Sequence, residues 1–380
     1  MVYLDHAATT PMRQAAIDAW VEHAAAVNPG GQYSSGRAAG AVLAQAREDI
    51  AELLGADPVE VVFTGSGTEA DNIAVRGLYR ARREAAGTNR VVASTIEHSA
   101  VLETVKSLGQ TEGAEVAWME PDRGGHIRDL SALDTPAAVA TMMWANNETG
   151  AVQPVREAAE RAAAAGTPLH IDAVQAVGKE DVHFHNSGAT TLAASAHKFG
   201  GPRGIGILLA RRSPVPAPVL LGGGQERGLR PGTVDVAAAA ATAAALREAL
   251  AERGAENARL AQLRDELIER IVAAVPDTRV TTPEPRLPGH AHVMFPGAEA
   301  ESMLMLLDSL GIEASAGSAC SAGVHRLSHV LEAMGVPTEE GMGALRLTLG
   351  RTTTAAAVSY THLTLPTTRL VCRSRWSPYH

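Results

Sequence analysis

The sequence contains few of the residues that mark several protein classes. Only two of its 380 residues are cysteine, which excludes a disulfide framework, and no Cys/His cluster has zinc-ligand spacing, so we expect no metal site. The net charge of -9 argues against nucleic-acid binding. The most apolar long run, residues 236–246, is too short to span a membrane, and the N-terminus lacks a secretory pattern. We therefore expect a soluble, cytoplasmic protein.

Aromatic residues are also scarce, at 3%, whereas the 46% of hydrophobic and 20% of charged residues are ordinary for a globular protein. A chain of 380 residues exceeds the usual size of one core, which favours two lobes. Two histidine pairs, His183/His185 and His290/His292, could each share a strand face. Neither pair has a third ligand nearby, so we interpret both as surface residues.

Between residues 60 and 210, short apolar runs alternate with helical patterns. This alternation predicts an α/β fold with a mostly parallel sheet, whose active site lies at the carboxyl ends of the strands. The candidate strands are "VEVVFT", "RVVAST", "EVAWME", "AAVATMMWA", "PLHIDAV" and "GIGILLA".

A long helical region follows at 235–275, with Gly254 as a possible break. Strands at "HAHVMF" and "ALRLTL" and a helix at "AESMLMLLDSLG" then predict a smaller unit. We expect a large domain at 14–245 and a small α+β domain formed by 1–13 and 246–358. Residues 359–380 change abruptly in composition, and we interpret them as a non-native tail that includes Cys372.

Cys320 is then the only thiol in the body of the chain, and its surroundings are unusual. It lies in "ASAGSACSAG", residues 314–323, among nothing larger than alanine or serine. A buried structural cysteine normally packs among larger apolar residues. The stretch fits either a small-residue loop with an incidental cysteine or a mobile nucleophile.

Three further motifs carry chemistry. In "FTGSGTEADN" a strand ends at Thr64 and a helix starts near Thr68, and such a glycine-containing turn can bind a phosphate or no ligand at all. Asp172 ends an apolar strand, where a carboxylate needs a cationic partner. Lys198, one of three lysines in the chain, lies in "SAHKFGGPRG" and is either a surface residue or an amine nucleophile that forms a Schiff base.

These parts, together and in order, resemble the cysteine desulfurases of the NifS/IscS type, which are class V, fold-type I enzymes that use pyridoxal phosphate (PLP). The resemblance covers roughly residues 2–358. The motifs that carry it are "YLDHAATTP", "FTGSGTEADN", "EHSAV", "NNETG", "HIDAVQAVGK", "SAHKFGGPRGIG", "GGGQERGLRPGT", "SAGSACSAG" and "LRLTLGR". It implies a large domain with a seven-stranded sheet. The family pattern after "LGR" continues into a closing helix, which here gives way to the unusual tail.

The resemblance implies three catalytic residues: Lys198 as the Schiff-base lysine and proton shuttle, His98 stacked on the PLP ring, and Cys320 as the sulfur carrier. Arg346 would hold the substrate carboxylate, with Asn147 near both substrate and cofactor. The implied cofactor-binding residues are Gly67, Thr68, Asn147, Asp172, Gln175, Ser195, His197, Lys198 and Thr233.

Among these residues, Asp172 would pair with the pyridine nitrogen and Gln175 with the ring's phenolic oxygen. Thr233 would reach the phosphate from a neighbouring subunit, which implies a homodimer with shared sites. The implied reaction takes L-cysteine to L-alanine and leaves a persulfide on Cys320 for a sulfur-acceptor protein, such as an iron–sulfur scaffold or a thiolation relay. A selenocysteine lyase, another class V enzyme and a non-catalytic scaffold are the alternatives.

Overall fold

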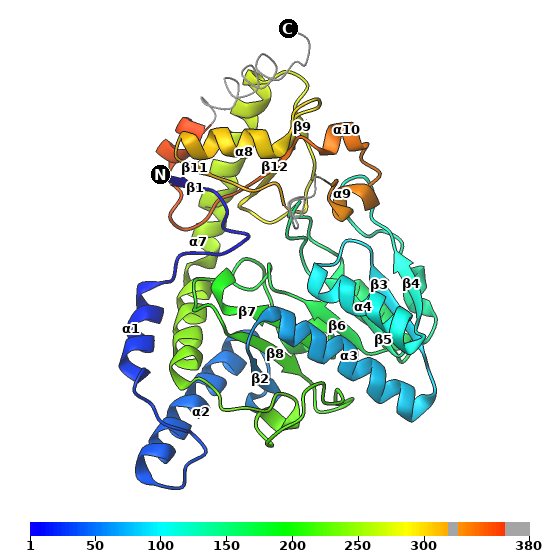
Figure 1. Cartoon of the computed structure of the whole chain (residues 1–380), viewed down its shortest axis with the longest axis vertical. Helices are drawn as coiled ribbons and strands as arrows, with labels where there is room; N and C mark the ends of the chain where they lie inside the picture. Colours follow the sequence, from blue (N-terminus) through cyan, green and yellow to red (C-terminus); the bar gives the residue numbers. More distant parts are fainter. Residues whose placement is uncertain (318–325, 362–380) are drawn as a thin grey trace.

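The computed structural model describes residues 1–317 and 326–361, which form two lobes joined by a long helix (Figure 1). Cys320 and Cys372 lie outside the described residues. Within the described residues, no helix is long and apolar enough to cross a membrane.

A seven-stranded sheet lies at the centre of the large lobe, in the order β2-β8-β7-β6-β5-β3-β4. Its strands are β2 (Val61–Thr64), β3 (Arg90–Ser94), β4 (Glu115–Met119), β5 (Val139–Met143), β6 (Leu169–Asp172), β7 (Thr191–Ser195) and β8 (Gly206–Ala210). All pairings are parallel except those of β8, which runs antiparallel to both β2 and β7. The predicted mostly parallel sheet is confirmed.

Helices cover both faces of this sheet because alternate strand residues are apolar on both sides. In β2, Val61 and Phe63 face the core formed with α2, α5 and α7, while Val62 faces α3 on the other side. The helices of this lobe are α1 (Gln14–His23), α2 (Ser34–Leu54), α3 (Gly67–Ala86), α4 (Ser99–Glu112), α5 (Val155–Ala164) and α6 (Phe184–Ser187). Short 3-10 turns lie at η1 (Pro58–Glu60), η2 (Ser131–Asp134), η3 (Ala196–Lys198) and η4 (Glu226–Gly228).

The small lobe has its own core and two small sheets. One is antiparallel, in the order β12-β10-β9, and the other pairs β1 with β11 in parallel. Its strands are β1 (Val2–Tyr3), β9 (Arg279–Val280), β10 (His290–Met294), β11 (Ile312–Glu313) and β12 (Ala344–Thr348). Its helices are α8 (Ala300–Ser309), α9 (His329–Ala333) and α10 (Thr338–Gly341).

Helix α7 (Val236–Ala274) joins the two lobes without a break. Its 39 residues span roughly 58 Å, and the helix continues through Gly254, so the possible break at that glycine is wrong. Ala249 packs in the core of the large lobe and Leu260 in that of the small lobe, and packing at both ends holds the helix across the glycine. We propose the two-domain division predicted above, with the boundary inside this helix.

The chain continues as a helix where the sequence predicts that the tail begins. Residues 355–361 are helical, and Val358 is buried in the small-lobe core. Tyr360 donates a hydrogen bond to the carbonyl of Leu310 at 2.9 Å. The start of a closing helix is therefore present and packs on the small lobe.

Candidate active site

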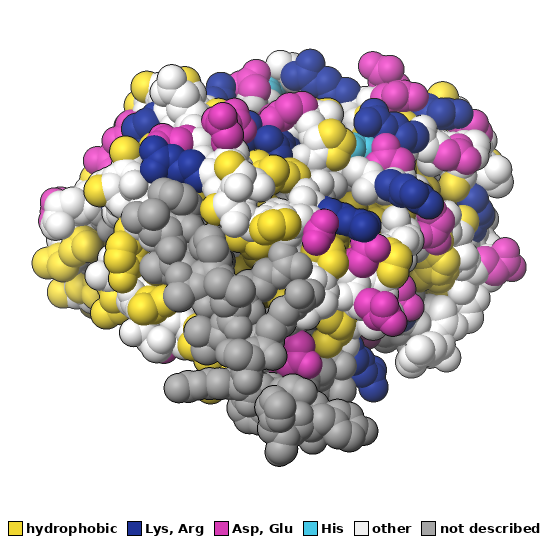
Figure 2. Space-filling view, turned by 90° about the horizontal axis from the view of Figure 1, so that it is seen from above, with side chains coloured by type: hydrophobic (Ala, Val, Ile, Leu, Met, Phe, Trp, Pro, Cys, Tyr) yellow, Lys and Arg dark blue, Asp and Glu magenta, His cyan; other side chains and the backbone are white. Residues whose placement is uncertain are grey.

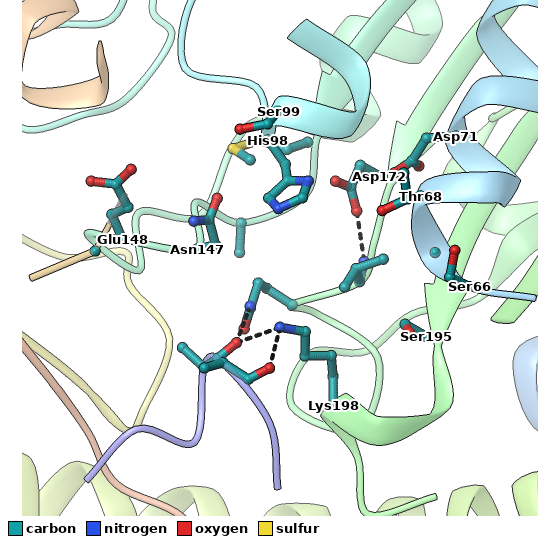
Figure 3. A pocket seen from close by; sticks show the side chains of 18 of the residues that line it. Ser66, Thr68, Asp71, His98, Ser99, Asn147, Glu148, Asp172, Ser195 and Lys198 are labelled. Carbon is teal, nitrogen blue, oxygen red and sulfur yellow. Dashed lines mark hydrogen bonds between the residues drawn. The ribbon is translucent and has the colours of Figure 1, made fainter. Parts of the chain in front are cut away.

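A cavity of about 420 Å³ lies between the lobes, at the carboxyl ends of β5, β6 and β7 (Figure 3). This is the edge of the sheet where the sequence predicts the active site. The residues from the sequence prediction that line the cavity are Gly67, Thr68, His98, Asn147, Asp172, Gln175, Ser195, His197, Lys198 and Arg346.

One predicted residue is not among the described residues that line it, and a second lies outside the described residues. Thr233 is exposed and lines a different surface cavity, together with Asn28 and Arg47. Cys320 lies outside the described residues, although Gly317, shortly before it in the chain, lines the active-site cavity.

One end of the cavity is the turn between β2 and α3. Ser66 caps the helix, because its Oγ accepts a hydrogen bond from the Glu69 backbone N–H at 3.1 Å. A Cβ on Gly67 would lie 2.8 Å from Cγ2 of Val174, so the close packing of this turn requires glycine. Thr68 is exposed toward the cavity and Ser195 is buried beside it. The N-terminal N–H groups of a 20-residue helix and these hydroxyls suit a phosphate.

Asp172, at the end of β6, is only 5% exposed. Its Oδ1 accepts a hydrogen bond from the Val174 backbone N–H at 2.9 Å, and no salt bridge joins it to a cation in the described part of the chain (Figure 3). Burial raises the pKa of Asp172, while His98 and Lys198 favour its charged form. A cationic ligand group, such as a protonated ring nitrogen, would supply the missing partner.

Lys198 follows β7 in the turn η3 and extends into the cavity (Figure 3). Its Nζ donates hydrogen bonds to the carbonyls of Ala7 at 2.6 Å and Ala8 at 2.8 Å. Burial, followed by repulsion from Arg346, lowers the pKa of Lys198 to about 8. About a tenth of the lysine is then a neutral amine at pH 7, the form that adds to a carbonyl group.

Gln175 lies beside this lysine and shares its carbonyl partner. Its Nε2 donates to the carbonyl of Ala7 at 2.8 Å, and its Oε1 accepts from Lys179 at 3.3 Å. Burial, with repulsion from Lys198 and Arg346, lowers the pKa of Lys179 to about 7. No sequence motif predicts a role for Lys179, and the scarcity of lysine in the chain is the one signal that points to it.

His98 and His329 bring two imidazoles to the cavity. His98 caps α4, because its Nδ1 accepts the Ala100 backbone N–H at 3.2 Å, so the neutral ring carries its proton on Nε2. Burial lowers the pKa of His98. His329, from α9, has Nε2 at 3.0 Å from the Glu97 carbonyl and must donate there. The sequence analysis missed His329, which reaches this site only through the packing of α9.

Arg346 brings a guanidinium from β12 of the small lobe to the cavity. Its Nη1 donates to the Asn147 carbonyl at 2.9 Å and its Nη2 to Asp5 Oδ1 at 2.7 Å. Within the described residues its buried Nε has no partner. His197, on the opposite lobe, lies 3.1 Å from Thr9 Oγ1 through Nδ1, and burial lowers its pKa to about 4.

Two buried acids lie at the cavity: Asp71 lines it, and Glu97 is buried next to His98 in the chain. Oε1 of Glu97 accepts from Ser94 Oγ at 2.9 Å and from the Met143 N–H at 3.0 Å, while its Oε2 is buried with no partner among the described residues. Burial, reinforced by Asp172, raises the pKa of Glu97 to about 8. Asp71 lies 3.1 Å from His170 Nε2, and burial raises its pKa as well. Burial therefore disfavours the charged form of Glu97 and of Asp71.

The interpretation of His290 and His292 as surface residues is wrong. Both are only 2% exposed, because β10 is the central strand of the small-lobe sheet. His292 Nδ1 lies 2.7 Å from Thr281 Oγ1, and burial lowers the pKa of both rings. His185 is exposed, and its Nε2 lies 2.6 Å from Glu60 Oε2, near Asp57.

Several known proteins are similar to this chain over nearly its whole length. Residues 2–360 match the family "Aminotransferase class-V". An IscS-like cysteine desulfurase of Mycobacterium tuberculosis is 44% identical over 375 residues, which cover 96% of this chain and 95% of that protein. A solved structure of a NifS-like protein has a TM-score of 0.90 at 30% identity and covers 97% of this chain and 99% of its own. The structure of SspA in complex with cysteine has a TM-score of 0.80 at 28% identity, with 93% and 100% covered.

The chain therefore belongs to the class-V aminotransferase family and has the fold-type I architecture. Within that family it is a PLP-dependent cysteine desulfurase of the NifS/IscS type. The cavity fits this cofactor by the chemistry of its donors. It offers helix N–H groups and hydroxyls for the phosphate, the unpaired carboxylate of Asp172 for the ring nitrogen, and the amine of Lys198 for the aldehyde.

Proposed function

We propose that this chain transfers sulfur from L-cysteine to Cys320, giving L-alanine and a persulfide. The observation that carries the proposal is the convergence of Lys198, Asp172 and Arg346 on one cavity from three distant parts of the chain. These residues supply an amine nucleophile, a carboxylate for a ring nitrogen and a guanidinium for a substrate carboxylate.

PLP, when bound, supplies an aldehyde that links to amines and a ring that withdraws electrons from the substrate carbon. We propose that Gly67, Thr68, Ser195 and His197 hold its phosphate, and that Asp172 and Gln175 hold its ring. Lys198 would then take and return the proton at the substrate Cα. A pKa of about 8 for Lys198 supports this role, because an amine that titrates near the working pH can both accept and donate a proton.

The substrate would be oriented from the small lobe. Arg346 already donates through Nη1 and Nη2, and its buried Nε retains an unused N–H in the described part of the chain. We propose that a substrate carboxylate binds at Arg346, with the Asn147 side chain next to it. His98 would stack on the cofactor ring, with its Nε2–H as a donor, because Ala100 occupies Nδ1.

In the sulfur-transfer step the Cys320 thiolate attacks the substrate sulfur. An S–S bond forms and the C–S bond breaks, and the electron pair of that bond stays on the substrate carbon, which is then protonated to the methyl group of alanine. Only the thiolate is a strong nucleophile. The persulfide would pass its outer sulfur to an acceptor protein, such as an iron–sulfur scaffold or a thiolation relay. A free thiol of this kind favours a reducing compartment, in line with the expected cytoplasmic location.

We further propose a homodimer in which Thr233 of one subunit completes the phosphate site of the other. In the single chain Thr233 is exposed and does not line the active-site cavity. Large apolar side chains are also exposed around α1 and the segment that leads to α2: Trp20 is 45% exposed, Val21 64% and Tyr33 56%. An apolar surface of this kind supports an interface with a second copy.

The test is the release of alanine and sulfide from L-cysteine by the PLP-loaded protein in the presence of a thiol reductant. We expect Lys198→Ala to lose both products together with the visible absorbance of the bound cofactor. We expect Cys320→Ala to keep that absorbance and lose sulfide release. Undiminished sulfide release by Cys320→Ala would overturn the role of this cysteine.

A further inference from the structure

Lys179 lies beside the active site and has no carboxylate partner among the described residues. It follows β6 in the same turn as Gln175, and its Nζ donates to Oε1 of Gln175 at 3.3 Å and to its backbone carbonyl at 3.2 Å. No salt bridge connects Lys179 to an acid in the part of the chain that the structure describes. Among the described residues, the Lys179 amine therefore makes all of its hydrogen bonds to Gln175.

That residue, Gln175, has an amide whose orientation is fixed by the Ala7 carbonyl. The Ala7 carbonyl can only accept, so the group 2.8 Å from it must be the amide nitrogen. The amide oxygen is then on the other side and faces Lys179, whose Nζ donates to it at 3.3 Å. Gln175 lines the cavity and is 5% exposed, and its second amide N–H has no acceptor among the described residues.

We propose that Lys179 is a positioning residue that holds the Gln175 side chain with this N–H available to the phenolic oxygen of the cofactor. The proposal rests on the role of Gln175 in the proposed function. Lys198 donates to the same Ala7 carbonyl at 2.6 Å, so a turned or displaced Gln175 amide also disturbs the carbonyl that holds the reactive lysine.

The expected signature is a shift in the pH at which the visible absorbance of the bound cofactor changes. A donor to the phenolic oxygen favours its ionised form, so loss of the donor raises this pH midpoint. We expect Lys179→Met to raise the midpoint by about half a pH unit or more. A hydrogen bond to a charged group is worth more than one pKa unit, and the freed Gln175 amide would be turned away from the cofactor for only part of the time.

A double-mutant cycle separates positioning from a general effect. If Lys179 acts through Gln175, Lys179→Met combined with Gln175→Ala gives the midpoint of Gln175→Ala alone. Lys179→Gln retains a donor without the charge and should stay near the wild-type midpoint. Lys106→Met, at an exposed lysine on α4 that pairs with Glu103, is the control and should leave the midpoint unchanged.

Additive shifts of the pH midpoint in the double variant would overturn the proposal. A midpoint of Lys179→Gln equal to that of Lys179→Met would also overturn it, because it would show that only the charge of Lys179 matters. An unchanged midpoint in Lys179→Met would overturn it as well. If Lys179→Met does not fold, Lys179→Ala provides the same comparison. The proposed function has a separate test. If it fails, Cys320 stays unmodified in a wild-type protein that binds PLP. The pH midpoints do not report on Cys320, so the two failures can be told apart.

Discussion

Replacement of Glu97 by Gln tests the electrostatics of the buried acid cluster. Glu97 is 0% exposed, and its pKa of about 8 means that the folded protein keeps this carboxyl protonated where the unfolded chain, with a pKa of 4.5, has lost the proton. The folded state therefore binds more protons between pH 4.5 and 8, and the contribution of Glu97 to stability falls as the pH rises through this window. Gln has the same shape and does not titrate.

The size of the effect follows from the pKa difference. For each pH unit within this window, the free energy of unfolding of the wild-type protein falls by about 1.4 kcal/mol relative to that of Glu97→Gln. The unfolding entropy of a chain of this length is on the order of 0.8 kcal/mol per kelvin, so the difference in Tm should grow by about 2 °C per pH unit. At pH 5 the two proteins should differ little, and at pH 8 the variant should be more stable by about 5 °C.

The assay is thermal unfolding of the PLP-saturated proteins, followed by circular dichroism from pH 5 to 9. Glu103→Gln is the matched control, because the Glu103 side chain on α4 is 67% exposed. Its Tm curve should run parallel to that of the wild-type protein. Parallel curves for Glu97→Gln as well would refute the claim that Glu97 is protonated in the fold.

Three further predictions concern other parts of the molecule. Burial lowers the pKa of His292 to about 3, so the unfolded chain binds more protons below pH 6.5 and stability falls as the pH drops. His292→Asn should flatten the decline in Tm between pH 6.5 and 4 by about 2 °C per pH unit, and an unaltered slope in the same unfolding assay would contradict this. Arg346→Lys should raise KM for L-cysteine by about 10- to 100-fold with a smaller change in kcat, because lysine cannot provide a bidentate contact. A fall in kcat alone, measured by steady-state kinetics, would count against binding of the substrate carboxylate by Arg346. Ser66→Ala removes the cap of α3 and should lower stability by about 1 kcal/mol and weaken PLP binding, and PLP titration with unchanged affinity would argue against a phosphate site at this turn.

Much of the large lobe could be predicted from local patterns. Strands buried on both faces read as apolar runs, and β2, β3, β4, β5, β6 and β8 all lie within the predicted segments. Strand direction is not encoded in such runs, because β8 is as apolar as its neighbours and yet runs antiparallel to them. The strand β7, which precedes the turn that carries Lys198, is not among the predicted segments.

The errors and omissions concern residues whose environment is set by distant parts of the chain. His290 and His292 have the sequence pattern of an edge strand, but their strand β10 lies between β9 and β12 in the small-lobe sheet. His329 and Arg346 reach the cavity only because the small lobe packs over the strand ends. The sequence indicates Arg346 only through family resemblance, since no local pattern relates it to Asp172 or Lys198.

The most direct test of the proposed function is mass spectrometry of the peptide that contains Cys320, after the PLP-loaded protein has been exposed to L-cysteine without reductant. We expect one added sulfur atom on Cys320 in the wild-type protein, and none in Lys198→Ala treated in the same way. An unmodified Cys320 in a protein that still converts L-cysteine to L-alanine would contradict it.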